Sequence, residues 1–161
     1  MPDMLVPLYD LPESRALEDQ VKNAGVSCRP AESYERLKVL EFVRGHWPSW
    51  LDEAAAAFSH VPPTMHVAVE EGQLIGFAAY NVTRPDYFGP TGVIEVKRKK
   101  GVGSLLLVRS LQSLAGQGYA YAIIGGVNGP EAFYEKAVGA MVIPGSETGI
   151  YGNNVNASTT T

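Results

Sequence analysis

The sequence predicts an α/β protein with α+β character, built on one mixed β-sheet. Three observations predict this fold: helical periodicity early in the chain, an antiparallel hairpin signal near its middle, and an alternation of strand, helix, strand, helix and strand after it. The strands nearer the N-terminus should be mostly antiparallel. Residues 93–127 should then form a parallel strand–helix–strand crossover.

Each element is indicated by a local pattern. Two apolar runs in residues 65–82 meet at "EEGQ", where Gly72 can supply the positive φ of a tight turn, so a hairpin is expected. Residues 102–118 are apolar on nearly all sides in their first turns and should form a buried helix. Other strands are expected at residues 4–9, 26–31, 90–96, 119–127 and 140–145, and other helices at residues 12–25, 32–47, 48–58 and 130–139.

The chain of 161 residues suits one domain, which we expect over residues 26–152. Residues 1–25 should form an N-terminal extension, a strand and a helix packed on that domain. The small polar residues 153–161 should form a flexible tail.

Charge and composition exclude several classes of protein. The net charge of −4 argues against nucleic-acid binding, and no stretch is apolar enough for a membrane span, so no membrane partner is expected. The N-terminus lacks the basic leader and apolar run of a secretory signal, which indicates a cytoplasmic protein. The single cysteine, Cys28, allows no disulfide framework and is expected in a strand.

The stretch "EVKRKKGVGSLLL", residues 95–107, concentrates positive charge between a strand and a helix. A helix N-terminus presents unpaired N–H groups and a partial positive charge, and both favour an anion. Gly101 and Gly103 leave the backbone accessible, and the three cations before them add charge. The turn is therefore a candidate phosphate site, although it lacks the endings of a Walker loop and of a dinucleotide fingerprint.

The segment "RKKGVG" resembles the Arg/Gln-x-x-Gly-x-Gly/Ala signature of the GNAT superfamily of N-acetyltransferases, and "FYEKAVGAMVI" resembles a second segment of that family. The resemblance implies a GNAT-like fold and an enzyme that transfers an acetyl group from acetyl-CoA to a primary amine of a small molecule or peptide, by direct attack in a ternary complex. It implies no metal. The chain could also form a homodimer.

The resemblance also implies residue roles. The backbone of the strand "GVIEV" would pair with the pantetheine arm, the turn would wrap the pyrophosphate, and Tyr134 would act as general acid for the departing thiolate. Asn128 lies close to the place where the family has an asparagine contact. The cofactor-binding residues expected are Val93, Ile94, Glu95, Val96, Arg98, Lys99, Lys100, Gly101, Val102, Gly103, Ser104, Asn128 and Tyr134.

The general base and the acceptor site are less defined. Glu95 is the candidate catalytic base beside the signature, and a water chain is the alternative. Aromatic residues with Asp52 and Glu53 could hold a cationic amine, although the tryptophans could equally close the core. The substrate-binding residues expected are Trp47, Trp50, Glu53, Tyr80 and Phe88.

Two other functions remain open. A non-catalytic acyl-CoA-binding module or sensor would keep the basic glycine turn without requiring Tyr134. A nucleic-acid contact through "KRKK" would require only the charge, which is the weakest of the three interpretations in an acidic chain.

Overall fold

The computed structural model describes residues 1–98, 100–127, 129, 131–152 and 155. Apart from Val155, the expected flexible tail lies outside these residues. The strands are β1 (Met4–Pro7), β2 (Val26–Pro30), β3 (Met65–Glu70), β4 (Gln73–Tyr80), β5 (Tyr87–Val93), β6 (Tyr121–Ile124) and β7 (Met141–Val142). The helices are α1 (Arg15–Asn23), α2 (Arg36–His46), α3 (Leu51–Ala57), α4 (Val102–Gly116) and α5 (Glu131–Val138). None of the helices within the described residues has both the length and the apolar composition needed to cross a bilayer.

All seven strands form one mixed sheet in the order β2-β3-β4-β5-β6-β1-β7. The pairs β2–β3, β3–β4 and β4–β5 are antiparallel, whereas β5 pairs with β6 in parallel. The prediction of antiparallel strands followed by a parallel strand–helix–strand unit is therefore confirmed. Residues 1–25, expected as an extension, supply α1 and also β1, which lies inside the sheet between β6 and β7.

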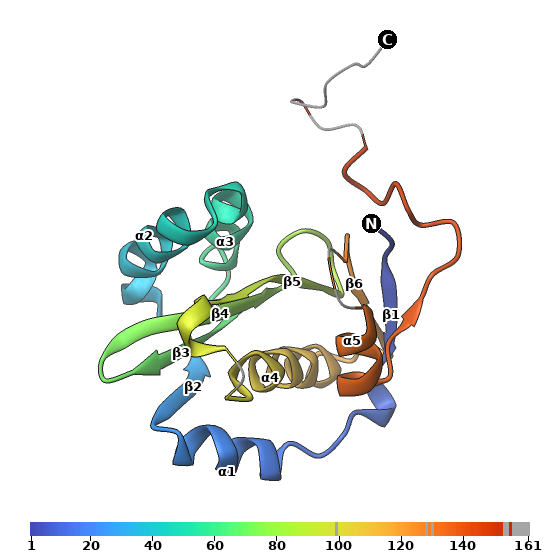
Figure 1. Cartoon of the computed structure of the whole chain (residues 1–161). Coiled ribbons are helices and arrows are strands. Elements are labelled where there is room, and N and C mark those ends of the chain that lie inside the picture. The colour runs from blue at the N-terminus through green and yellow to red at the C-terminus, as the bar shows by residue number, and fades with distance from the viewer. Residues whose placement is uncertain (99, 128, 130, 153–154, 156–161) are drawn as a thin grey trace.

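Helices cover both faces of the sheet (Figure 1), with α2 and α3 on one side and α1 and α4 on the other. Alternation along β4 explains the two layers, because successive side chains of a strand point to opposite faces. Phe77 and Ala79 belong to the core under α2 and α3, whereas Ala78 and Tyr80 belong to the core around α4. The α4 core is the larger one, as the apolar pattern of that helix predicts.

The β3–β4 hairpin turns at Glu71 and Gly72, which have φ values of 50° and 76°, so the turn predicted at "EEGQ" is confirmed. The strand predicted at residues 90–96 is shifted: β5 begins at Tyr87 and ends at Val93, and Glu95–Lys97 form a turn of 3-10 helix. Beyond the Gly76–Val93 pair, the Ile94 N–H still donates to the Ile75 carbonyl oxygen, and the chain then leaves β4 as it enters the 3-10 turn.

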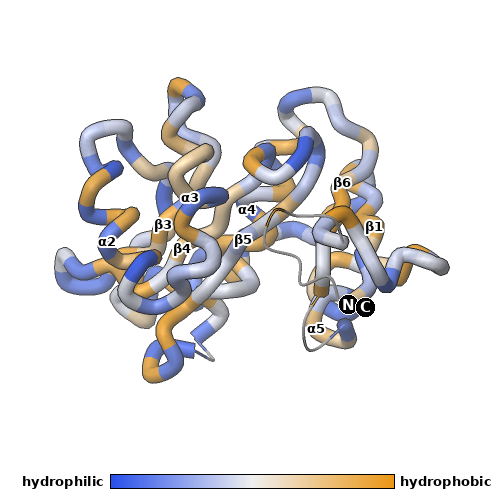
Figure 2. The backbone as a smooth tube through the Cα atoms, turned by 90° about the horizontal axis from the view of Figure 1, so that it is seen from above, coloured by the Kyte–Doolittle hydropathy of each residue, from blue (hydrophilic) through white to orange (hydrophobic). Residues whose placement is uncertain are grey.

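The parallel pairing of β5 with β6 is short. It joins Tyr87 to Ile123 and Phe88 to Ile124, after which β6 ends and β5 continues to Val93 paired with β4 only. Figure 2 shows the molecule from above. One lobe is formed by α2, α3, β3 and β4, the other by β6, β1 and α5, and α4 lies between them. The separation of β5 from β6 opens the sheet between the two lobes.

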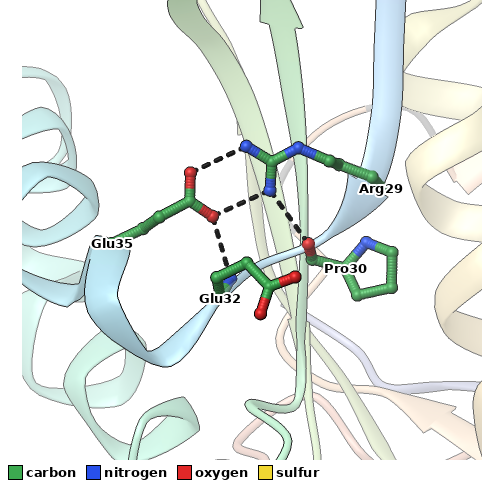
Figure 3. A network of polar contacts seen from close by, with 4 residues as sticks. All are labelled: Arg29, Pro30, Glu32 and Glu35. Atoms are coloured by element: carbon green, nitrogen blue, oxygen red, sulfur yellow. Dashed lines mark hydrogen bonds and ion pairs between the residues drawn. The ribbon is translucent and has the colours of Figure 1, made fainter.

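A polar network fixes the connection from β2 to α2 (Figure 3). Arg29 donates from both terminal nitrogens to the carboxylate of Glu35 at 2.7 Å, and Arg29 Nη1 also donates to the Pro30 carbonyl oxygen at 3.1 Å. The Glu32 N–H donates to Glu35 Oε1 at 2.9 Å. The Arg29 hydrogen bonds hold the pKa of Glu35 below its usual value. The network thereby sets the direction in which the α2–α3 layer leaves the sheet.

We expect Glu35→Gln to lower the free energy of unfolding by about 0.5–1 kcal/mol at neutral pH, because the pair is partly solvated. The pKa of Glu35 is lowered in the folded state, so its contribution is present above the ordinary carboxyl pKa and is lost as the pH falls through the lowered one. Urea unfolding at several pH values measures this, with Glu41→Gln on exposed α2 surface as the control. Equal stability of the two variants would contradict the assignment.

Candidate functional site

The basic glycine turn connects β5 to α4, as predicted. Gly101 caps α4 with a left-handed φ of 78°. A Cβ atom there would lie 2.9 Å from Leu17 Cδ1 of α1, closer than real Cβ contacts allow. Glycine is required at this position both by its φ and by the approach of α1. Gly103, two residues later, lies in α4. A Cβ atom there would meet nothing closer than Val93 Cγ2 at 3.8 Å.

The positive charge of the turn is partly neutralised by the hairpin. Lys97 Nζ lies 2.5 Å from Glu70 Oε1, and Lys100 Nζ lies 3.8 Å from Glu70 Oε2. The hydrogen bond from Lys97 is the main cause that lowers the pKa of Glu70. Arg98 points elsewhere: its Nε donates to the Val93 carbonyl oxygen at 3.2 Å.

A cavity of about 520 Å³ lies against this turn, and we call it the turn cavity. It is bounded by the end of β5, the start of α4 and the aromatic pair of α5. Its lining residues are Phe88, Thr91, Gly92, Val93, Arg98, Gly101, Gly103, Ser104, Leu107, Phe133 and Tyr134. The N-terminal end of α4 thus opens on a space that also receives an arginine side chain, an arrangement that favours an anionic group.

The edge of β5 that faces this cavity leaves the Val93 N–H free to pair, whereas the Val93 carbonyl oxygen accepts the Arg98 hydrogen bond. The Ile94 N–H donates to the Ile75 carbonyl of β4 at 2.9 Å. Because backbone groups alternate in direction along a strand, the N–H and C=O of Val93 point away from β4. In the described part of the chain, no strand pairs with β5 on that side beyond Phe88.

A second cavity, of about 420 Å³, lies on the other side of β5, and we call it the Glu53 cavity. It is bounded by the start of α3, the loop after β4, β5, the loop after β6 and the C-terminal segment. Its lining residues are Met1, Ser49, Trp50, Glu53, Thr83, Tyr87, Phe88, Gly89, Pro90, Thr91, Ile124, Gly125, Gly126, Val127, Tyr134 and Tyr151.

Glu53 is the carboxylate that the described lining residues bring into this cavity. Its Oε2 accepts a hydrogen bond from the Thr83 hydroxyl and another, at 3.2 Å, from the Tyr151 hydroxyl. Burial raises the pKa of the Tyr151 phenol, which therefore stays protonated and able to donate at neutral pH. Three separate segments of the chain thus meet at one oxygen atom.

Asp3 holds the C-terminal segment that carries Tyr151. The Asp3 carboxylate, 7% exposed, accepts the Gly126 N–H at 2.8 Å, and the Asp3 N–H donates to Ser146 Oγ at 2.8 Å. The Ile143 N–H donates to the Asp3 carbonyl oxygen at 2.9 Å. Asp3, the residue just before β1, therefore ties the loop after β6 to the segment that carries Tyr151.

The two cavities share Phe88, Thr91 and Tyr134. Tyr134 lies on α5 next to Phe133, with the two ring centroids 5.1 Å apart. Burial raises the pKa of the Tyr134 phenol, so the hydroxyl is protonated at neutral pH. A group at this common wall can act on a bond between ligands in the two cavities.

The structure brings together only some of the residues expected from the sequence. The expected residues that line a cavity are Trp50, Glu53, Phe88, Val93, Arg98, Gly101, Gly103, Ser104 and Tyr134. Trp47 and Tyr80 pack in the two cores, Val102 is buried, and Ile94 packs against the α4 core. Lys100 contacts Glu70, and Lys99 and Asn128 lie outside the described residues.

Glu95 and Val96 are exposed on the 3-10 turn and line neither cavity. Strand alternation does not decide the direction of Glu95, because β5 ends at Val93 before it. Asp52 is also exposed and outside both cavities. The described residues include no group of three His, Cys, Asp or Glu side chains placed to hold a metal ion.

Sequence reasoning missed Asp3 and Tyr151. Neither lies near a motif. Tyr151 donates a hydrogen bond to Glu53 in the cavity, and Asp3 accepts one from Gly126 in the loop after β6. The one local signal was Asp3 itself, an acidic residue immediately before an otherwise apolar strand. An aspartate in that position needs buried partners.

Gly92 marks the closest approach of the tryptophan layer to β5. A Cβ atom there would lie 2.6 Å from Trp47 Cζ2, and the Trp47 ring is itself stacked on Trp50 at 5.7 Å. We expect Gly92→Ala to cost about 1–3 kcal/mol of unfolding free energy and to alter the tryptophan fluorescence. Gly103→Ala, where space exists, is the matched control and should leave both unchanged or slightly raise stability. Normal fluorescence and stability in Gly92→Ala would refute the contact.

Comparisons with known proteins agree on the fold. A fungal multi-domain GH3 beta-N-acetylglucosaminidase, in which a GCN5-related glucosamine N-acetyltransferase region exists, has a TM-score of 0.72 at 13% identity, over 88% of this chain and 19% of that chain. A GCN5-related N-acetyltransferase from Sphaerobacter thermophilus has a TM-score of 0.66 at 18% identity, over 88% of this chain and 48% of that one. One from Kribbella flavida has a TM-score of 0.56 at 18% identity, over 88% and 53%.

The chain therefore spans between 19% and 53% of the length of these three proteins. A comparison with curated protein sequences finds no match. The model of the acetyltransferase (GNAT) family matches residues 30–140, which include β3 to β6, α4 and α5. The chain belongs to the GNAT family of acetyltransferases.

Proposed function

We propose that this chain is an acetyl-CoA-dependent N-acetyltransferase, which acetylates a primary amine while both substrates are bound. The observation that carries the proposal is the common wall of the two cavities at Phe88, Thr91 and Tyr134. A thioester held in the turn cavity and an amine held in the Glu53 cavity would meet there without a covalent enzyme intermediate.

The turn cavity fits the anionic and extended parts of acetyl-CoA. Its pyrophosphate would bind the unpaired N–H groups at the start of α4, with Arg98 as the cation of the cavity. Its pantetheine amides would pair with the Val93 N–H on the open edge of β5. Gly103 leaves the space that the pyrophosphate requires, because its Cβ position is open.

In the reaction, the neutral amine nitrogen attacks the thioester carbonyl carbon, the C–N bond forms, the C–S bond breaks, and the sulfur leaves as a thiolate that needs a proton. The Tyr134 phenol is placed to supply that proton, and its raised pKa keeps it protonated beforehand. The proton released by the amine passes to water, since Glu95 lies outside both cavities.

We expect Tyr134→Phe to reduce kcat about 10²- to 10⁴-fold, the usual range for a lost general acid. The affinity for CoA should change little, because the ring and its packing remain. Thiol release measured with saturating amine, beside calorimetry with CoA, separates the two effects. Undiminished turnover would show that Tyr134 is not the acid, and CoA binding without turnover in the wild type would favour an acyl-CoA-binding module or sensor.

Gly103→Leu should abolish binding of both acetyl-CoA and CoA, because the side chain would occupy the space beside Val93. Gly103→Ala is the control for helix and fold, since its methyl group has room. Calorimetry with acetyl-CoA, CoA and ATP measures the loss. Unchanged affinity in Gly103→Leu, with the fold confirmed by circular dichroism, would place the pyrophosphate elsewhere.

A further inference from the structure

Glu53 is oriented before any ligand binds. Both described hydrogen bonds to its carboxylate, from Thr83 and from Tyr151, fall on Oε2. No described residue donates to Oε1. Both described donors are neutral, and Oε1 can accept a hydrogen bond from a cation in the cavity.

Aromatic rings line the same cavity as this carboxylate. Trp50, Tyr87 and Tyr151 line the same cavity, and Trp50 is held in place by its stack on Trp47. The Tyr151 ring also approaches the loop after β6, where it would lie 3.7 Å from a Cβ atom at Gly126. Aromatic faces together with one carboxylate attract a cation and also exclude water from it.

Glu53 does not belong to the wall that the two cavities share. Tyr134 lines both cavities, whereas Glu53 lines only its own. The amine that attacks must also be neutral, and a carboxylate next to it would favour its protonated form. Glu53 is therefore suited to a group of the acceptor other than the amine that becomes acetylated.

We propose that Glu53 is the specificity-determining residue of the acceptor site, and that the acceptor is a small amine with a second positive charge, which Glu53 binds. This inference rests on the proposed function, since it names the acceptor class of the same reaction. The cavity of about 420 Å³, closed by the segment that Asp3 holds, has the volume of a small-molecule site.

Binding of the second charge can be measured independently of turnover. The full chain, with and without CoA, is titrated by calorimetry with a series of α,ω-diamines from diaminopropane to diaminohexane, and with monoamines of matched chain length. We expect the best diamine to bind about 10- to 100-fold more tightly than its matched monoamine, the range for one hydrogen-bonded ion pair. Glu53→Gln should remove that difference.

Asp52→Asn is the matched control, because it removes the same charge from an exposed neighbour on the same helix. It should retain the preference for diamines. Equal binding of diamines and monoamines by the wild type, an intact preference in Glu53→Gln, or an equal loss in Asp52→Asn would each overturn the inference.

Kinetics then separate this inference from the proposed function. With acetyl-CoA present, Glu53→Gln should raise KM for the preferred diamine about 10- to 100-fold and leave kcat nearly unchanged, as expected for a contact remote from the reacting atoms. Turnover of diamines and monoamines with equal KM would support the proposed function and overturn the role of Glu53. Binding of diamines that depends on Glu53, without release of thiol, would support that role and overturn the acetyl transfer.

Discussion

The whole site depends on the separation of β5 from β6. Their parallel pairing stops after two residue pairs, at Phe88 and Ile124, yet β5 continues to Val93. A sheet that opens in this way loses backbone hydrogen bonds, and the loss is tolerable only if something holds both strands from behind. Helix α4 does so: it buries apolar side chains along its length and lies between the two lobes in Figure 2. The unpaired edge of β5 and the start of α4 then face a single cavity.

The charges around the basic glycine turn determine which cation faces the cavity. A cluster of cations before a helix would by itself attract many anions, but Glu70 takes up Lys97 and Lys100 from the side of the hairpin. The same contacts fasten the turn to β3, so that the turn does not depend on a ligand for its position. Arg98, which braces its own strand through the Val93 carbonyl, is the cation that lines the cavity. Among the residues that the structure describes, the site therefore combines Arg98 with the N-terminus of α4.

Local physical rules explain which parts could be predicted from the sequence. The hairpin at Glu71 and Gly72, the buried helix that starts at Val102 and the parallel crossover all follow from residue types and spacing within short segments. The end of β5 could not be placed this way, because the 3-10 turn that follows it has no clear local signal, and the direction of Glu95 depends on that turn. The position of β1 between β6 and β7 is a pairing between residues far apart in the chain, for which no local pattern exists.

The two cavities also differ in how close together their lining residues lie in the sequence, and this difference has a functional meaning. The turn cavity is built almost wholly from residues 88–107, with Phe133 and Tyr134 added from the next helix. The Glu53 cavity draws on the N-terminal residue, α3, the loop after β4, β5 and the C-terminal segment, joined through Asp3, Thr83 and Tyr151. A ligand that is the same for every reaction of the family can be held by one compact unit. An acceptor that differs from one enzyme to another is better held by separate segments, since each can change its side chains without disturbing the strand–turn–helix unit beneath it.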